Sequence, residues 1–293
     1  MIKTAVIGAS GYVGRHLLRA YRGAFPDAVG TSFSASDPRL TRFDIRRPDI
    51  SALRLEETGH KAVVIASAKP NIAFCEANKE ESYAVNVEGT LELARRLGRT
   101  SLRVIFLSSD YVFEGTAGGY DDAAATAPTT EYGRQKVLVE KQLPSLAKDA
   151  LILRLSKIYG VQKGDGTLLD EMAASFADRR PVRAARDQTF CPTNVSDLVR
   201  CATAVQDAGA AGIVNLCNPE RRARFDIAAK LAAAMAADPS LAQGVSLHDI
   251  PAMAGRPLDT SMKCSRLSAL VPDARFTPLE DDIRRVAVNW ARR

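Results

Sequence analysis

The sequence predicts an α/β fold in which a doubly wound parallel sheet carries a smaller C-terminal lobe, and three observations predict it. Short strands that are apolar throughout alternate with helical segments over the first 160 residues or so. This alternation is typical of a parallel sheet covered by helices on both faces. A glycine-rich turn, GASGYVG, follows the first strand. Beyond about residue 160 the alternation loosens, which indicates a second lobe.

The elements follow in order from the hydrophobic pattern. The first strand is expected from Thr4 to Ile7, and a helix follows in RHLLRAYRG. Further strands are expected in DAVGTSFS, KAVVIAS, LRVIFLSS and ALILRLSKIYG. The helices between them are expected in DISALRLEETG, in ESYAVNVEGTLELARRLG and from near Tyr132 onward, after a loop over 115–129. This is the pattern of a Rossmann-type fold.

The C-terminal part reads as helices in TLLDEMAASFAD, VSDLVRCATAVQ and FDIAAKLAAAMAA, with a strand in GIVNLCN. We therefore expect a Rossmann domain over 1–160. Residues 161–293 are expected to form mainly the second lobe, with some segments returning to the first domain.

Composition excludes several classes of protein. The net charge is +6 and the pI about 9.1, but the basic residues are scattered in pairs without an extended run, so we expect no nucleic-acid partner. The five cysteines are odd in number and lack CxxC spacing, and the three histidines lie far apart, so no disulfide framework and no metal site are expected. No apolar run is long enough for a membrane span or signal peptide. A cytoplasmic location is expected.

The turn GASGYVG predicts a dinucleotide site. Gly8, Gly11 and Gly14 lie between a strand and a helix, where glycines let the backbone approach a pyrophosphate that sits on the helix N-terminus. An acidic residue that binds the adenosine ribose is expected about 20 residues further on. Small hydroxyl residues stand there instead.

Thr31, Ser32 and Ser34 in GTSFSAS leave room for a 2′-phosphate, which Arg39 or Arg42 could approach. This favours NADPH over NADH. The alternative is that Asp37 folds back to the ribose, and NADH then remains usable.

Tyr132 and Lys136 in TEYGRQK share one face of a predicted helix, one turn apart. An ammonium beside a phenol favours the phenolate, so the pair is suited to proton transfer. Ser109 in FLSSDYVF emerges at the carboxyl end of a buried strand, where open α/β sheets bind their ligands. On their own, these residues could equally be a surface helix pair and a turn-making serine.

Seven motifs in order make the sequence resemble the extended short-chain dehydrogenase/reductase superfamily, and within it the dTDP-4-dehydrorhamnose reductase group of sugar-nucleotide-binding reductases. They span nearly the whole chain: GASGYVG, YAVNVEGT, LSSDYVFEG, YGRQK, RLSKIYG, DQTFCPTNVSDL and RPLDTSM. The tyrosine and lysine mark the superfamily, whereas DYVF, YGRQK and DQ…PT point to the narrower group.

The resemblance implies catalytic roles for four residues. Tyr132 would protonate a sugar carbonyl oxygen as hydride arrives from the nicotinamide. Positive charge from Lys136 and the oxidised nicotinamide would bring the tyrosine pKa toward the working pH. Ser109 would orient the same carbonyl, and Asn86 would support Lys136 through structural water.

The resemblance also implies the binding residues. Those for the cofactor, besides Tyr132 and Lys136, are Gly8, Ser10, Gly11, Tyr12, Val13, Gly14, Ser34, Asp44, Ile45, Ala66, Ser67 and Ala68. Those for the substrate are Ser109, Asp110, Tyr111, Val112, Phe113, Gln188 and Arg256. Arg256 suits a diphosphate because a guanidinium pairs with two phosphate oxygens.

The sequence departs from the narrow group at the sugar pocket. Lys157 in RLSKIYG stands where the group carries a tryptophan, and the loop AKPNIAFCE differs as well. We therefore expect an NADPH-preferring reductase of a nucleotide-linked 4-keto-6-deoxyhexose, with dTDP-4-dehydro-L-rhamnose as the first candidate. Another nucleotide-sugar reductase or epimerase, or a non-catalytic binding protein like the regulatory subunit of methionine adenosyltransferase, stays open. The resemblance allows a homodimer.

Overall fold

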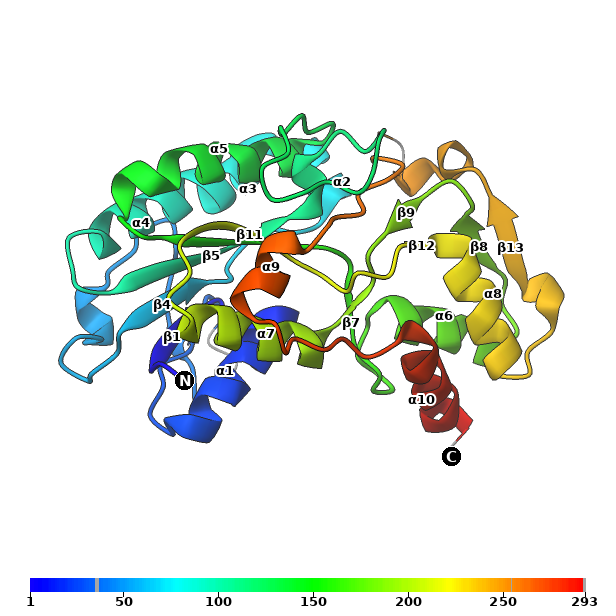
Figure 1. Cartoon of the computed structure of the whole chain (residues 1–293), viewed down its shortest axis with the longest axis horizontal. Coiled ribbons are helices and arrows are strands. Elements are labelled where there is room, and N and C mark those ends of the chain that lie inside the picture. The colour runs from blue at the N-terminus through cyan, green and yellow to red at the C-terminus, as the bar shows by residue number, and fades with distance from the viewer. Residues whose placement is uncertain (35–36, 254, 292–293) are drawn as a thin grey trace.

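The computed structural model describes residues 1–34, 37–253 and 255–291, and its centre is a five-stranded parallel sheet (Figure 1). The strand order is β1-β4-β5-β6-β11. The five strands are β1 (Thr4–Ile7), β4 (Ala62–Ile65), β5 (Arg103–Ser109), β6 (Leu151–Leu155) and β11 (Gly212–Leu216). All four neighbouring pairs are parallel. The predicted α/β fold class is confirmed.

Helices cover both faces of the sheet, as Figure 1 shows. On one face lie α3 (Lys79–Tyr83), α4 (Thr90–Leu97) and α5 (Glu131–Leu146), with α2 (Ile72–Ala77) beside them. On the other lie α1 (Tyr12–Ala24), α7 (Val195–Asp207) and α9 (Ser265–Leu270). Side chains alternate along each strand, so Ile7 and Val63 pack under the first group and Val6 and Val64 under the second. This double burial explains why the strands are apolar throughout.

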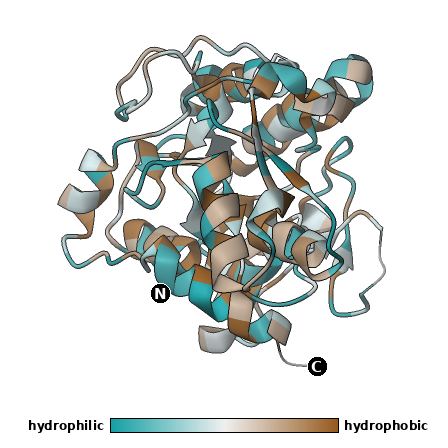
Figure 2. Cartoon of the chain, turned by 90° about the vertical axis from the view of Figure 1, so that its right-hand side faces the viewer, coloured by the Kyte–Doolittle hydropathy of each residue, from teal (hydrophilic) through white to brown (hydrophobic). Residues whose placement is uncertain are grey.

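A second group of elements packs around its own apolar cluster, on the right of Figure 1. Figure 2 looks onto it and shows helices on which hydrophobic and hydrophilic residues alternate. Its helices are α6 (Leu168–Ala177), α8 (Arg224–Ala234) and α10 (Leu279–Ala291). Its short strands pair as β8 (Val182–Ala185) with β13 (Ala242–Val245), and as β9 (Thr189–Phe190) with β12 (Arg222–Ala223). A further pair, β7 (Ile158–Tyr159) with β10 (Thr193–Asn194), lies between the two groups.

Two expected elements are wrong in detail. The helix expected over 49–59 is only a 3₁₀ turn, Ser51–Leu53, because Asp49 accepts from the Ser51 amide (3.1 Å) and Arg54 has a left-handed φ of 47°. The strand expected over 27–34 shrinks to β2 (Thr31–Ser32), which pairs with β3 (Thr41–Arg42).

The helix expected over 81–98 is present, but its middle is a π-helical segment, Ala84–Gly89, between α3 and α4. Such segments interrupt the regular ladder and often lie at functional sites. Among the described residues, we find no helix that combines the length and the apolar character needed to cross a bilayer.

Candidate active site

The first of two neighbouring cavities is a groove of about 350 Å³ at the carboxyl end of β1. Gly8 leaves the strand with a φ of +88°, and a Cβ at Gly14 would lie 2.3 Å from the Gly8 carbonyl oxygen. Only glycine allows this close approach of α1 to the strand. The groove is lined by Gly8, Ser10, Gly11, Phe33, Ser34, Phe43, Asp44, Ile45, Arg46, Ala66, Ser67, Ala68, Lys69, Glu81 and Val85.

Most of the residues expected to bind cofactor line this groove, three lie beside it, and two, Tyr132 and Lys136, lie outside its lining on α5. The Tyr12 hydroxyl donates to Asp165 Oδ2 (3.2 Å), on the loop that follows β7. Val13 packs against the apolar cluster under α1, and Gly14 lies against Gly8. These three shape the turn and are absent from the groove lining.

Hydroxyl groups surround the groove near the end of β2. Thr31 Oγ1 accepts from the Gly8 amide (3.2 Å), and Ser32 Oγ lies 3.1 Å from Ser10 Oγ and 3.2 Å from Ser34 Oγ. Arg39 binds Asp37 through two nitrogens (3.0 and 2.8 Å), and this holds the pKa of Asp37 at about 2. The Asp37 carboxylate is therefore paired with the Arg39 guanidinium.

Sequence reasoning missed Arg46 and Phe33 in the groove wall. Arg46 pairs with Asp44 (2.7 Å), and its guanidinium lies 5.2 Å from the centre of the exposed Phe33 ring. A flat cation over an exposed ring offers a stacking surface for a base. The dipeptide Arg46-Arg47 was visible in the sequence, but nothing local showed that Phe33 would lie beside it.

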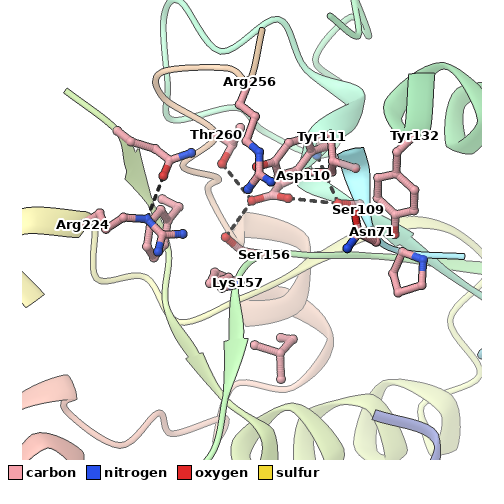
Figure 3. A pocket seen from close by; sticks show the side chains of 15 residues that line it. Asn71, Ser109, Asp110, Tyr111, Tyr132, Ser156, Lys157, Arg224, Arg256 and Thr260 are labelled. Carbon is pink, nitrogen blue, oxygen red and sulfur yellow. Dashed lines mark hydrogen bonds between the residues drawn. The ribbon is translucent and has the colours of Figure 1, made fainter. Parts of the chain in front are cut away.

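The second cavity, of about 360 Å³, opens beside the carboxyl ends of β5 and β6 (Figure 3). Seven separate parts of the chain build it. Its lining is Pro70, Asn71, Ile72, Ser109, Asp110, Tyr111, Tyr132, Ser156, Lys157, Ile158, Gln188, Phe190, Arg224, Arg256 and Thr260. Figure 3 shows Tyr132 on one side, Arg224 on the other, and Asp110 between them. We call it the pocket.

Tyr132 lies in the first turn of α5. The Oγ1 of Thr130 caps this helix by accepting from the Gly133 amide (3.2 Å). A Cβ at position 133 would lie 2.1 Å from the Tyr111 carbonyl oxygen, so α5 rests directly on the turn after β5. This contact sets the distance between Tyr132 and Ser109.

Lys136 lies one turn after Tyr132 and is buried. Its Nζ donates to the Leu107 carbonyl oxygen (2.8 Å) and lies 4.6 Å and 5.5 Å from the ring centres of Phe106 and Tyr132. Burial lowers the pKa of Lys136 to about 8, although Glu140 one turn further opposes this. The ammonium can thus titrate near physiological pH.

The prediction that Lys136 and the oxidised nicotinamide together lower the pKa of Tyr132 concerns the cofactor-bound state, and in the chain itself the pKa of Tyr132 is raised. Burial raises the pKa of Tyr132, Asp110 adds to the rise, and a hydrogen bond with Ser109 opposes it. The reason is that desolvation of a phenolate outweighs a cation whose Nζ is engaged with a carbonyl oxygen. The phenol keeps its proton and is ready to donate it.

Three hydroxyl groups surround the buried carboxyl of Asp110. Ser109 Oγ donates to Oδ1 (3.0 Å), and Ser156 Oγ and Thr260 Oγ1 donate to Oδ2 (2.9 and 2.8 Å). Burial raises the pKa of Asp110, while these hydroxyls oppose the rise. The carboxyl therefore fixes the orientation of Ser109. Ser156 and Thr260 were not expected in the site.

Asn86 lies in the π-helical segment and does not contact Lys136 directly. Its Oδ1 accepts from the Lys69 amide (2.7 Å), and its Nδ2 donates to the Lys69 carbonyl (3.1 Å) and to Gln135 Oε1 (2.7 Å). It therefore joins the loop after β4 to α5, through the residue that precedes Lys136.

Two expected substrate residues lie elsewhere. Val112 and Phe113 are fully buried, and Phe113 stacks on Tyr120 with ring centres 4.3 Å apart. The 3₁₀ turn Asp110–Val112 turns the chain inward after Tyr111, which removes both side chains from the pocket. Asp110, Tyr111, Gln188 and Arg256 do line it.

Cations gather at the end of the pocket away from Tyr132. Arg224 donates through Nε to Gln188 Oε1 (2.9 Å), and Lys157 and Arg256 line the same cavity. Burial and the neighbouring Arg224 lower the pKa of Lys157, although its side chain reaches solvent. Arg224, which begins α8, was missed because its place beside Gln188 depends on the β9-β12 pairing.

Several known proteins are similar to this chain. A family model described as the RmlD substrate binding domain matches residues 2–287. A dTDP-4-dehydrorhamnose reductase of Mycobacterium tuberculosis is 30% identical over 288 residues, which cover 94% of this chain and 88% of the relative. Methionine adenosyltransferase 2 subunit beta of Danio rerio is 25% identical, with coverage of 96% and 89%.

Among solved structures, a dTDP-4-dehydrorhamnose reductase of Bacillus anthracis in complex with NADP superposes with a TM-score of 0.83. It is 22% identical and covers 98% of this chain and 99% of its own. At this identity the likeness shows the shared fold.

Proposed function

The chain belongs to the RmlD substrate-binding domain family and is an oxidoreductase of the extended short-chain dehydrogenase/reductase fold, and we propose that it reduces a nucleotide-linked 4-keto-6-deoxyhexose with NADPH. The first candidate substrate is dTDP-4-dehydro-L-rhamnose, and the product would be dTDP-L-rhamnose. One observation carries the proposal. The loop after β4 walls both cavities, with Ala66–Lys69 in the groove and Pro70–Ile72 in the pocket, so a cofactor and a sugar can meet beside Tyr132.

The groove fits a dinucleotide. A Cβ at Gly8 would lie 2.6 Å from the Ser67 backbone, so the turn leaves space only for backbone at the start of α1. Gly8, Ser10 and Gly11 would hold the pyrophosphate, and Asp44, Ile45 and Phe33 would contact the adenine. When bound, the cofactor would supply a hydride to the carbonyl carbon.

Tyr132 would donate its proton to the carbonyl oxygen, since burial keeps the phenol protonated. The Ser109 hydroxyl, which donates to Asp110 in this structure, would turn to donate to that oxygen and hold it in place. The charged Lys136 would stabilise the phenolate left behind and bind the ribose hydroxyls of the cofactor. Asn86 would keep the loop after β4 against α5.

The cationic end would bind the diphosphate. Arg224 and Arg256 can each offer two donors to phosphate oxygens, and Lys157 adds a point charge between them and the sugar. Gln188 holds Arg224 in place.

The preference for NADPH rests on the carboxylates of the groove. Among the described residues that line it, the acids are Asp44 and Glu81, which pair with Arg46 (2.7 Å) and Lys69 (3.0 Å). Asp37 is paired with Arg39. No free carboxylate in the described part of the groove therefore opposes a 2′-phosphate near Ser34.

The proposal includes the organisation of the protein. Residues 1–160 would form the cofactor domain, and 161–293 mainly the substrate lobe, with β11 and α7 returning to the sheet. A homodimer, a cytoplasmic location and the lack of a nucleic-acid partner belong to the same proposal. Sedimentation, fractionation and gel-shift measurements test them.

The central experiment measures NADPH oxidation by the purified protein with a panel of nucleotide-linked 4-keto-6-deoxy sugars, and product stereochemistry by NMR. Turnover of the dTDP compound to the rhamnose product supports the narrow assignment. Turnover of another panel member, such as the D-configured epimer, would change the assigned sugar but not the assigned reaction.

The similarity to methionine adenosyltransferase 2 subunit beta favours a second candidate, a non-catalytic binding protein. Tight binding of NADPH without turnover of any panel member would favour it over the reductase.

A further inference from the structure

Three thiols from distant parts of the chain lie together behind one wall of the pocket. Cys191 follows β9, Cys217 follows β11 and Cys264 precedes α9. The sulfur atoms of Cys217 and Cys264 lie 3.2 Å apart, and Cys264 Sγ also donates to the Cys217 carbonyl oxygen (3.2 Å). The proposed reaction uses none of these thiols.

This thiol cluster is linked to Asp110 through Ser156. The Cys191 amide donates to Ser156 Oγ (3.2 Å), which donates in turn to the Asp110 carboxyl. Thr260, which also donates to that carboxyl, lies four residues before Cys264 on the same segment. A covalent change at Cys264 therefore acts on the wall that holds Ser109.

We propose that Cys217 and Cys264 form an oxidation-sensitive site that closes to a disulfide bond when the protein meets a peroxide. The sulfurs need to approach from 3.2 Å to about 2.05 Å. Cys264 is partly accessible, so peroxide can reach it, whereas Cys217 is fully buried beside it.

Cys191 is the competing partner for Cys217, and its backbone contacts hold it back. Its Sγ donates to the Met262 carbonyl oxygen (3.6 Å) and accepts from the Met262 amide (3.5 Å). These two contacts tie the Cys191 sulfur to Met262, whereas Cys217 Sγ makes one longer contact with the Met262 carbonyl oxygen (3.9 Å) and lies 3.2 Å from Cys264 Sγ.

The chemistry balances with hydrogen peroxide as the oxidant. The Cys264 thiol is oxidised to a sulfenic acid, and the peroxide is reduced to one water molecule. The Cys217 sulfur then attacks the Cys264 sulfur, the S–O bond breaks, and a second water leaves with the Cys217 proton. The net change is the loss of two hydrogen atoms from the protein.

The crosslink would span 47 residues and restrain the segment that carries Thr260. Closing a loop of this length reduces the freedom of the unfolded chain, so the oxidised protein should melt at a higher temperature. The groove shares no residue with the crosslink, so NADPH binding should stay unchanged. A changed KM for the sugar nucleotide is a further expectation that rests on the proposed function.

The test treats the full-length protein with limited hydrogen peroxide and counts thiols after denaturation. The reduced chain has five cysteines, so one disulfide leaves three. Trypsin should release residues 264–266 joined to residues 201–221. The longer peptide also contains Cys201, so the assignment is made in the Cys201→Ala variant. In the wild-type protein, the Cys201 thiol has no sulfur hydrogen bond among the described residues, so its removal disturbs no such contact.

The Cys264→Ser variant should keep its thiols and show no peroxide-dependent rise in melting temperature. A thiol count of five after treatment, a Cys191–Cys217 crosslink, or the same loss of thiols in Cys264→Ser would overturn the proposal. Cys217→Ser provides a second removal of the pair if the first variant folds poorly. Thiol counts and peptide maps need no turnover, so they stand apart from any failure of the proposed reaction.

Discussion

The groove and the pocket differ in how the chain builds them. The groove uses mainly short stretches that follow β1, β2, β3 and β4, with Glu81 and Val85 added from the helix after them, and its key feature is backbone brought close by glycine. The pocket collects polar side chains from seven parts of the chain, up to 150 residues apart in the Thr260–Asp110 contact. The comparison teaches that cofactor binding is encoded locally, whereas substrate choice depends on how the two groups of elements pack.

Replacing Tyr132 by Phe should have the largest effect, because this pocket residue is the proposed general acid. Loss of the general acid should reduce kcat by about 10²- to 10⁴-fold. NADPH affinity, measured by fluorescence titration, should change little, and Tyr83→Phe, at an exposed position of α3, is the matched control. A Phe variant with near wild-type kcat would refute the role.

The pH profile should show the titration of Lys136, which lies one helical turn after Tyr132. Its pKa is about 8 in the fold, against 10.5 for the free group, so its charge is lost as pH rises through about 8. kcat/KM should therefore fall above that pH. Between about pH 8 and 10.5 the unfolded chain holds this proton and the fold does not, so the group's contribution to stability rises over the same window.

Steady-state rates across this range check the assignment to Lys136. Lys136→Arg keeps its charge at high pH, so the fall in kcat/KM should move to a higher pH, whatever the absolute rate of this variant. Lys141→Met, on the exposed side of α5, should keep the wild-type profile. A profile unchanged in Lys136→Arg would assign the fall to another group.

Ser34→Asp should sharpen the comparison by altering the groove alone. A carboxylate beside the 2′-phosphate should lower the ratio of kcat/KM for NADPH to that for NADH by about tenfold, which corresponds to ~1.4 kcal/mol. Ser34→Asn has nearly the same size without charge and should lose far less. An equal loss in both variants would show that the shape of the site, and not charge, sets the preference.

Lys157→Met should alter the pocket alone, with the smallest effect. Loss of the Lys157 charge, which reaches solvent, should raise KM for the sugar nucleotide by about two- to fivefold. The reason is that a solvent-exposed ion pair, here between Lys157 and the diphosphate, contributes up to ~1 kcal/mol. KM for NADPH should stay constant, and Lys163→Met, outside both cavities, should match the wild type. A change in KM for NADPH instead would show that the groove and the pocket do not act separately.

The sequence predicted what short-range spacing determines. The glycine turn, the position of Ser109 at a strand end and the Tyr132–Lys136 pair all follow from residues within a few positions of each other. The sheet could be predicted because its strands are buried on both faces.

The remaining features depend on contacts between distant residues. Nothing near Thr260 or Ser156 indicates that both donate to Asp110, and nothing near Arg224 indicates that Gln188 holds it. The raised pKa of Tyr132 in the chain itself has the same origin, because desolvation is a property of the packed site and not of a four-residue spacing.

Gly133 has a consequence for laboratory evolution of this protein. It contributes no reactive group, yet any side chain there would meet the Tyr111 carbonyl oxygen and push the tyrosine's helix away from the strand end. A saturation library screened for new sugars should thus find position 133 closed to every other amino acid, whereas its neighbour Arg134, which is exposed on the same helix, accepts many. The geometry of the reaction is protected by a residue that takes no part in it.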